Sequence, residues 1–478
     1  MKKHYGAVAV IFIIILICLL LFKVDFRTVD SLMRPPKNEG ENFEIQTAFE
    51  SVAGDKYSFK SPLSGDYNSS FISVDLNGDG DNEVLVFYCY MNTLDSVRVN
   101  ILDKVDDKWQ SIADIESAHS DIHRVEFADT DNDGYKEIIL GCSIYETELT
   151  NTLAVYKINK KDDSYSIKNV FTSSYTDFVV CDVNNDKKTD LLVFDKQNGN
   201  NLTGVRATFY NFGNNRAYNS GEYRVTPVIS SISSVKYDTD TEKGVIRFYV
   251  DGFKADSTMT TDVFQWDSVD KSFTGEVLFD DITVSSTATR NINIACADIN
   301  SDSVMEIPVE VVLPGRSADL KERTVDKTLT AIKWVQINKG ELSTVNYELI
   351  NTAKSYSIAF ADEWFGKFAV KNDNDTGLLT FYSAVQPEQN SPEGKDKKPK
   401  KKKEEGEQPP PEEAGFSYNE DDMLFSVFAT SDSDNNLYEL SGYRFIKSDN
   451  GYNYYCLIYN KGKQAGITKE TVKNILIT

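Results

Sequence analysis

The sequence predicts an all-β fold, more specifically a β-propeller of four-stranded blades, and three observations lead to this class. A short acidic segment recurs along the chain at intervals of 53 to 58 residues. Each interval holds four strand-like runs separated by polar turns. The run after each acidic segment is apolar without alternation, which is typical of a strand covered on both faces. A radial array of small stacked sheets combines these properties.

The acidic segment opens with an aspartate in each clear copy, namely Asp75, Asp129, Asp182 and Asp298. The spacings between these residues are 54, 53 and 116, and the last spacing is twice 58. The doubled interval predicts a further copy near residue 238, and residues 235–250 (VKYDTDTEKGVIRFYV) supply an altered one. Because Ile246 occupies the ninth position of this copy, we expect it to have lost its metal site.

The second unit illustrates the expected strands, which are His123–Ala128, Glu137–Ser143, Thr152–Ile158 and Tyr165–Phe171. Five such units fit residues 66–350, with residues 43–62 closing the ring. Six or seven blades would require the C-terminal region to supply the others. We therefore predict a propeller over residues 43–350, with five blades as the first expectation.

The acidic segments share the spacing D-x-[DN]-x-D-x-x-x-[DE]. Positions 1, 3, 5 and 9 offer side-chain oxygens and position 7 a backbone carbonyl, and no His or Cys joins them. Hard oxygen ligands of this kind suit Ca²⁺. The candidate ligands are Asp75, Asn77, Asp79, Asp81 and Glu83 in the first loop, Asp129, Asp131, Asp133, Tyr135 and Glu137 in the second, Asp182, Asn184, Asp186, Lys188 and Asp190 in the third, and Asp298, Asn300, Asp302, Val304 and Glu306 in the fourth.

Two carboxylates about 4 Å apart repel by roughly 4 kcal/mol at an effective dielectric near 20, so a compact acidic turn favours a bound cation. An EF-hand is excluded, because its twelfth position would be a glutamate that leads into a helix, whereas Val86, Leu140, Val193 and Val309 stand there. The alternative is an acidic turn that holds no ion. We expect the second loop to bind most tightly, since it carries four ligand carboxylates against three elsewhere.

These loops resemble the FG-GAP/VCBS repeats of integrin-α-type β-propellers, and the resemblance covers roughly residues 66–350. It implies a membrane-anchored protein of bacterial type in which D-x-D-x-D-G-x-x-D loops join two strands of a blade and hold Ca²⁺. The match is closest where Gly80 and Gly134 supply the glycine of the pattern. It is weaker where Lys187 and Ser303 replace a glycine that tolerates a positive φ.

The N-terminal region predicts an uncleaved signal anchor. Residues 6–22 form an uncharged apolar run of 17 residues after a short tail (residues 1–5) that we place in the cytoplasm. Residues 23–42 are polar and read as a stalk, so the bulk of the chain is expected outside the cell membrane. A lipoprotein would need small residues before Cys18, and Leu16-Ile17 do not provide them.

The C-terminal region, residues 351–478, is expected to form a small α+β module, because the repeat period fails there. Its strand-like runs are GLLTFYS (377–383), MLFSVFA (423–429), GYRFI (442–446) and NYYCLIY (453–459). A short closing helix is expected after Thr468, its candidate N-cap. An alternative makes residues 356–370 a worn sixth repeat. Residues 387–415 are a Lys/Glu/Pro-rich insertion, predicted to be disordered and either a solvated loop or an adhesive segment for anionic polymer.

The composition narrows the function. A formal charge of −23 argues against a nucleic-acid partner, and the five widely spaced cysteines after Cys18 predict buried thiols rather than disulfides. No nucleophile elbow, phosphate-binding loop or H-E-x-x-H motif is present, and His119 and His123 flank a turn. We expect a non-catalytic recognition or adhesion module for protein or glycan partners. The alternatives are a polysaccharide hydrolase or lyase and a structural envelope component.

Overall fold

The computed structural model describes fourteen parts of the chain, which are residues 40–117, 119–143, 151–161, 164–199, 202–240, 244–276, 284–311, 329–338, 340–352, 354–373, 377–383, 419–431, 438 and 441–478. The predicted anchor (6–22), the predicted stalk up to residue 39 and the insertion at 387–415 lie outside these residues. Among the residues that are described, no helix is both long enough and apolar enough to cross a membrane.

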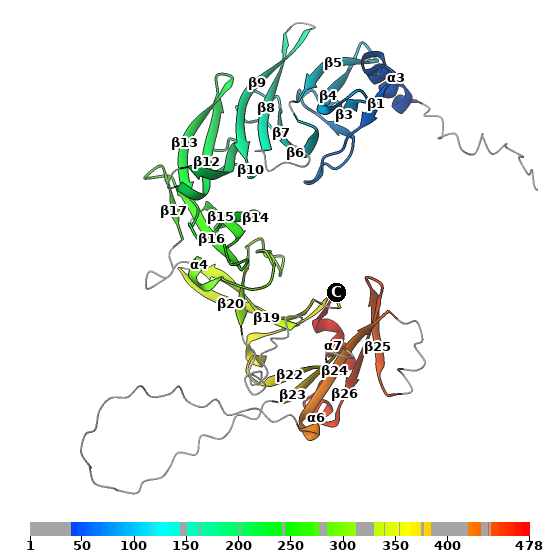
Figure 1. The fold of residues 1–478 in the computed structure, drawn as a ribbon, viewed down its shortest axis with the longest axis vertical. Coiled ribbons are helices and arrows are strands. Elements are labelled where there is room, and N and C mark those ends of the chain that lie inside the picture. The colour runs from blue at the N-terminus through cyan, green and yellow to red at the C-terminus, as the bar shows by residue number, and fades with distance from the viewer. Residues whose placement is uncertain are drawn as a thin grey trace, which may run out of the picture. The chain divides into compact units, whose positions relative to one another are not determined.

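The described chain is mostly β-structure, in six antiparallel sheets of four or five strands (Figure 1). The chain divides into two compact units. One contains residues up to Val125 together with Ile158–Ile167, and the other contains Glu126–Lys157 and Lys168–Thr478. The all-β prediction is confirmed, and the sheets are described one by one below.

The first sheet follows helix α3 (Glu41–Ala53) and has the order β1-β3-β4-β5, with β2 also paired to β3. Its strands are β1 (Tyr57–Phe59), β2 (Phe71–Val74), β3 (Glu83–Tyr90), β4 (Thr93–Val105) and β5 (Lys108–Glu116). The residues of β3 are buried on both sides until its last position, in agreement with the unbroken apolar run in the sequence.

Helix α3 covers one face of the first sheet. Phe49 is fully buried and contacts the rings of Tyr57 and Tyr88 edge-on, with centroids 4.9 and 5.0 Å away. Val84 and Val86 of β3 join the same cluster, whereas Leu85 between them points to the opposite face. Residues 43–62, expected to close a ring of blades, instead form this helix and β1. Among the described residues no closed propeller is seen, and α3 covers a face of the first sheet.

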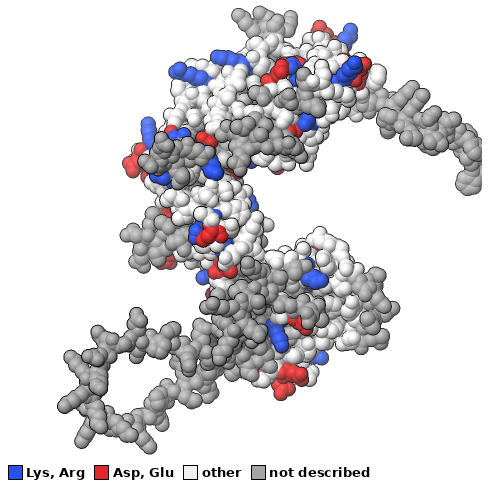
Figure 2. Space-filling view, in the orientation of Figure 1, with Lys and Arg blue, Asp and Glu red and all other residues white. Residues whose placement is uncertain are grey.

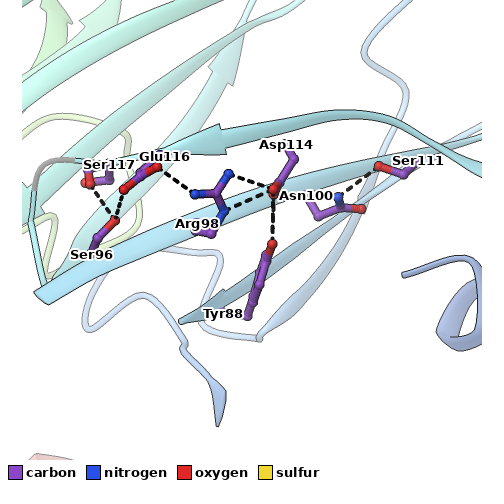
Figure 3. A network of polar contacts seen from close by, with 8 residues as sticks. All are labelled: Tyr88, Ser96, Arg98, Asn100, Ser111, Asp114, Glu116 and Ser117. Carbon is purple, nitrogen blue, oxygen red and sulfur yellow. Dashed lines mark hydrogen bonds and ion pairs between the residues drawn. The ribbon is translucent and has the colours of Figure 1, made fainter. Parts of the chain in front are cut away.

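A polar network ties the three longest strands of the first sheet together (Figure 3). The Arg98 guanidinium donates to Asp114 at 2.8 and 3.0 Å and to Glu116 at 2.7 Å. The Tyr88 hydroxyl donates to the same Asp114 carboxylate at 3.0 Å. Tyr88 also belongs to the cluster beneath α3, and Tyr88, Arg98 and Glu116 lie opposite one another in register, so they share the sheet face that the helix covers.

The next three sheets follow the repeat. The second is β6 (Asp121–Ala128), β7 (Glu137–Ser143), β8 (Asn151–Lys161) and β9 (Ser164–Tyr175); the third is β10 (Asp177–Cys181), β11 (Asp190–Gly199), β12 (Leu202–Gly213) and β13 (Arg216–Arg224); the fourth is β14 (Ser231–Asp240), β15 (Val245–Phe253), β16 (Met259–Asp267) and β17 (Ser272–Gly275). Each runs in chain order, so neighbouring strands are joined as hairpins. The four strands expected in the second sequence repeat (residues 123–171) are confirmed.

Within the larger unit, consecutive sheets pack face to face. In β11, Leu191 and Val193 pack with Ile139 of the second sheet, whereas the alternate residues Leu192 and Phe194 pack with the fourth sheet. Successive side chains of a strand point to opposite faces, so a strand between two sheets is apolar at every position. The sequence-based argument for strands covered on both faces is confirmed for this part of the chain.

The fifth sheet extends beyond the expected boundary at residue 350. Its strands are β18 (Ile307–Val311), β19 (Leu329–Asn338), β20 (Glu341–Asn351), β21 (Tyr356–Phe360) and the C-terminal β27 (Leu476–Ile477). A short helix, α4 (Val284–Thr287), precedes it. Residues 356–360, which we assigned to the C-terminal module, are thus the fourth strand of this sheet, and β27 pairs with their other edge as the outer strand.

The sixth sheet, of order β22-β23-β24-β26-β25, is the core of the C-terminal module. Its strands are β22 (Phe368–Asp373), β23 (Leu378–Ser383), β24 (Met423–Thr430), β25 (Arg444–Asp449) and β26 (Tyr452–Ile458), with short helices η3 (Asp362–Trp364), η4 (Glu420–Asp422), α6 (Asn460–Gln464) and α7 (Lys469–Ile475). The helix expected after Thr468 is confirmed, since the Thr468 hydroxyl accepts the Thr471 N–H in a capping box. The five cysteines of the described chain are free and buried, as expected.

Candidate metal sites

The four acidic loops occupy the same place in their sheets. The first (75–83), second (129–137) and third (182–190) each join two antiparallel strands, β2 to β3, β6 to β7 and β10 to β11. The fourth (298–306) lies between an isolated bridge, Ala297 to Glu306, and strand β18. In every loop the ninth position begins, or directly precedes, the buried apolar strand.

A common set of hydrogen bonds shapes the loops. The carboxylate at position 1 accepts backbone N–H groups from across the turn: Asp129 accepts from Asp133 and Gly134, at 3.2 and 2.9 Å. The same donors serve the first aspartate of the third and fourth loops, and in the first loop Gly78 and Gly80 donate instead. The aspartate at position 5 accepts the N–H of position 7 in all four loops.

The acid at position 9 is the buried anchor of each loop. Glu83, Glu137, Asp190 and Glu306 are at most 1% exposed, and each accepts the N–H of position 2 at 2.7 to 3.1 Å. Burial raises the pKa of Glu83 and of Asp190 to about 7, and neighbouring carboxylates add to the rise. Burial also raises the pKa of Glu137 and of Glu306. A cation beside these groups would favour their charged form.

The turn keeps its backbone shape where glycine is missing. Gly80 and Gly134 have φ values of 93° and 91°, and Lys187 and Ser303 take 68° at the same position. The weaker resemblance of the third and fourth loops therefore does not change their conformation. The cost is a non-glycine residue in the left-handed region, about 1–2 kcal/mol in each loop.

Apart from the second loop, the third is the loop of the described chain whose carboxylates gather closely enough to hold a hard divalent cation. In the third loop, one carboxylate oxygen from each of Asp182, Asp186 and Asp190 lies within 4.8 Å of the others. Position 3 is an asparagine in the first, third and fourth loops, namely Asn77, Asn184 and Asn300. Its amide oxygen is also a type of Ca²⁺ ligand. All of these side chains offer oxygen donors, and the ion pairs that the described residues form at the loops are those of Lys157 with the second loop.

The second loop differs, because a lysine ammonium lies among its carboxylates. Lys157 of β8 is 4% exposed, and its Nζ lies 2.5 Å from Asp131 Oδ2, 2.6 Å from Asp133 Oδ2 and 3.7 Å from Glu137 Oε1. Burial alone would lower the pKa of Lys157, but its hydrogen bonds to the two aspartates raise it. Asp129, Asp131 and Glu137 also bring three oxygens within 4.8 Å of one another.

The strand that follows the buried apolar strand places one residue beside position 9, one step beyond the last paired residues of the hairpin. Sequence reasoning missed these residues. They are Asp103, Lys157, Asn211 and Gln336. Asn211 donates to Asp190 at 2.6 Å, and Gln336 donates to Glu306 at 2.5 Å and to Asp302 at 2.8 Å. The sequence feature that could have revealed these residues is their spacing. A polar residue follows position 9 by 20 residues in the first two sheets and by 21 in the third.

The altered copy near residue 238 uses its aspartate for packing. Asp238 is buried in β14 and accepts hydrogen bonds from the Tyr249 hydroxyl and the Met305 N–H, both at 2.8 Å. Its strand pairs directly with β15 up to Ile246 and Val245, where the other copies have the ninth-position acid. The expected loss of a metal site in this copy stays a prediction, and the described contacts give its aspartate another role.

A cavity of about 660 Å³ lies beside the first loop, between α3 and the first sheet. Three aromatic side chains line it, Phe59, Phe71 and Trp109, and Asp81 and Asn82 of the first loop form part of its wall. Phe59 and Phe71 are 41% and 37% exposed, which is unusual for large apolar side chains in this sheet. Polar groups of α3, Asn42 and Gln46 among them, complete the lining.

The fold and loops together define a class of protein, a series of small antiparallel sheets whose connecting turns carry clustered acids. Within this class, residues 75–140 match the family described as an FG-GAP-like repeat, and they contain the first and second loops complete. No curated protein matches the chain. Among solved structures, a hypothetical protein from Leishmania major is 10% identical, over 66% of this chain and 94% of that one, with a TM-score of 0.22.

Proposed function

We propose that this chain is a non-catalytic recognition protein that binds a glycan in the cavity beneath α3, with Ca²⁺ ions tying strands together at the acidic loops. The cavity is the observation that carries the proposal. Its aromatic side chains suit the apolar face of a sugar ring, and its amide and carboxylate groups suit ring hydroxyls. This lining favours a glycan over a flat protein surface as the partner.

Calcium and ligand binding are linked in this proposal. Asp81 and Asn82 belong to the first loop and also line the cavity. An ion held by Asp75, Asp79 and Glu83 would fix the turn that carries these two residues, which lowers the conformational cost of ligand binding. Loop sites of modest affinity fill readily outside a cell, where Ca²⁺ is abundant, and this agrees with the predicted anchor at residues 6–22.

A partner other than nucleic acid remains our expectation. On the face drawn in Figure 2, basic and acidic side chains of the described residues are interspersed and do not form one broad basic area. The net charge of the sequence is −23. Sequence-independent binding to nucleic acid depends on clustered Lys and Arg side chains. We therefore still expect that nucleic acid is not a partner of this chain.

Binding of the purified full-length chain to a glycan array, in Ca²⁺ and in EDTA, tests the proposal. We expect binding to specific glycans in Ca²⁺ and weaker binding in EDTA. Phe71→Ala should reduce binding at least tenfold, while Leu63→Ala, which removes an exposed apolar side chain outside the cavity lining, should not. Binding that is unaffected by Phe71→Ala would contradict the cavity assignment. Product release from any polysaccharide would favour the hydrolase or lyase alternative.

A further inference from the structure

The residue that faces position 9 from the strand after the buried apolar strand sets the charge beside each loop. The facing side chain is acidic in the first sheet (Asp103), basic in the second (Lys157) and neutral in the third and fifth (Asn211 and Gln336). The second loop is also the one with aspartate rather than asparagine at position 3, Asp131. The additional acid and the facing base thus occur in the same sheet and contact each other at 2.5 Å.

The ammonium of Lys157 binds two of the oxygens that a metal ion could use, whereas Asp131 Oδ1 and Glu137 Oε1 have no hydrogen-bond partner among the described residues. The ammonium contacts Asp131 Oδ2 and Asp133 Oδ2, and these side chains hold positions 3 and 5 of the ligand pattern. In the third loop the corresponding oxygen, Asp186 Oδ2, accepts only a neutral amide, from Asn184 at 3.2 Å. The second loop therefore has a cation where the third has none among its described contacts.

A calcium ion and this ammonium are poorly compatible at one site. Ca²⁺ binds carboxylate oxygens at about 2.3–2.6 Å. An ion that shared Asp131 Oδ2 or Asp133 Oδ2 with Lys157 would lie within about 5 Å of Nζ, the sum of the two contact lengths, and the two cations would repel. Lys157 is almost fully buried, so it would have to leave its position for the ion to bind.

We propose that the Lys157 ammonium is the resident cation of the second loop, which is held together without Ca²⁺, while the first, third and fourth loops take the ion. This inference depends on the proposed calcium binding at those three loops. It reverses the expectation that the second loop binds most tightly. The fourth carboxylate of that loop serves the lysine and adds no affinity for a metal.

Calcium stoichiometry of the purified full-length chain, measured by equilibrium dialysis with radioactive Ca²⁺, tests the inference. We expect three ions per chain for the wild type, one for each loop without a facing base. Lys157→Gln copies the facing residue of the fifth sheet and should add one ion. The reciprocal change, Gln336→Lys, should remove one. Lys136→Gln removes a positive charge from the same loop without touching its carboxylate contacts, and should leave the count unchanged.

A second readout separates loss of the ion pair from loss of the fold. In EDTA, Lys157→Gln should melt at a lower temperature than the wild type, because its carboxylates lose their counter-ion, and Ca²⁺ should restore the difference. If this variant does not fold, Asp131→Asn/Lys157→Gln gives the second loop the same side-chain types as the fourth and should likewise bind one additional ion.

Three outcomes would overturn the inference. These are four ions bound by the wild type, no ion gained by Lys157→Gln or by the double variant, and an equal gain in Lys136→Gln. A wild type that binds no Ca²⁺ would refute the proposed calcium function instead. In that case a single ion gained by Lys157→Gln would still show that the Lys157 ammonium keeps Ca²⁺ out of the second loop, and no gain would refute that role as well.

Discussion

Arg290 and Asp251 form an ion pair in which neither side chain reaches solvent. Arg290 Nη2 lies 2.7 Å from Asp251 Oδ1, and its other donors bind the carbonyls of Ala288 and Ile294 at 2.8 and 2.7 Å. The second oxygen of Asp251 accepts the Cys296 N–H at 2.8 Å. A buried charge is tolerated only with partners on most of its hydrogen-bonding atoms, and this pair meets that condition.

Replacing one member of the buried pair should cost far more stability than replacing a member of an exposed one. Arg290→Met leaves the Asp251 carboxylate buried without its counter-ion, so we expect the free energy of unfolding to fall by about 3–5 kcal/mol. Arg206→Met breaks a half-exposed pair with Glu222 and should change it by less than about 1 kcal/mol. Denaturant unfolding of both variants measures the difference, and similar losses would contradict this account.

His119 gives the first unit a defined pH dependence. Burial lowers its pKa, and neither ring nitrogen has a hydrogen-bond partner in the described chain. Because the pKa of His119 is lower in the folded state than the unfolded value of about 6.5, the unfolded state binds more protons below that pH. The contribution of His119 to the free energy of unfolding is therefore complete above about pH 6.5 and is lost as the pH falls below it. The difference in unfolding free energy between wild type and His119→Leu should therefore decrease from pH 8 to pH 5. A difference that is constant with pH would exclude the effect.

At the scale of elements, the strands and loops could be predicted, whereas α3 and the facing residues could not. The strands of the repeats follow from unbroken apolar runs and the loops from their acid spacing. Helix α3 buries only Ala48, Phe49 and Ala53, so its apolar pattern is too sparse to indicate a helix. The contact of Lys157 with the second loop depends on a hairpin register that places it opposite Glu137, and residue spacing alone does not reveal that pairing.

The glycine position of the loops offers a test of their shared backbone. Lys187→Gly and Ser303→Gly should each raise the free energy of unfolding by about 1 kcal/mol, since both residues sit at a φ of 68°. Lys188→Gly, at the next position and without a positive φ, should lower it instead. Thermal unfolding in EDTA measures this without a contribution from metal, and destabilisation by all three glycines would contradict the shared conformation.

For the molecule as a whole, the acidic loops connect stability to calcium. An ion that binds only the folded state stabilises it by about 4 kcal/mol at a thousandfold excess over its dissociation constant. We therefore expect EDTA to lower the melting temperature by several degrees, at about 2–4 °C for each kcal/mol in a large domain. Asp75→Ala should reduce the difference between the melting temperatures in Ca²⁺ and in EDTA. An unchanged difference would show that the first loop holds no ion.

Helix α3 shields apolar residues of the first sheet from solvent. Phe49→Ala should cost about 3–5 kcal/mol and uncover apolar residues of β3, so the protein should also self-associate. Phe43→Ala, in the same helix but 57% exposed, is the matched control. Light scattering and denaturant unfolding measure the two effects. A Phe49→Ala protein that stays monomeric would indicate that the helix does not shield the sheet.

A sheet face sealed by a helix imposes no condition on the number of repeats that come after it. In a closed ring the sheets must complete a full turn, so adding or deleting one strains all the others. Sheets that pack face to face, as the second, third and fourth do, depend mainly on their immediate neighbours, as in repeat proteins generally. Duplication of one 54-residue segment could then lengthen the chain while its N-terminal end stayed intact. Evolution can adjust such a protein in whole units.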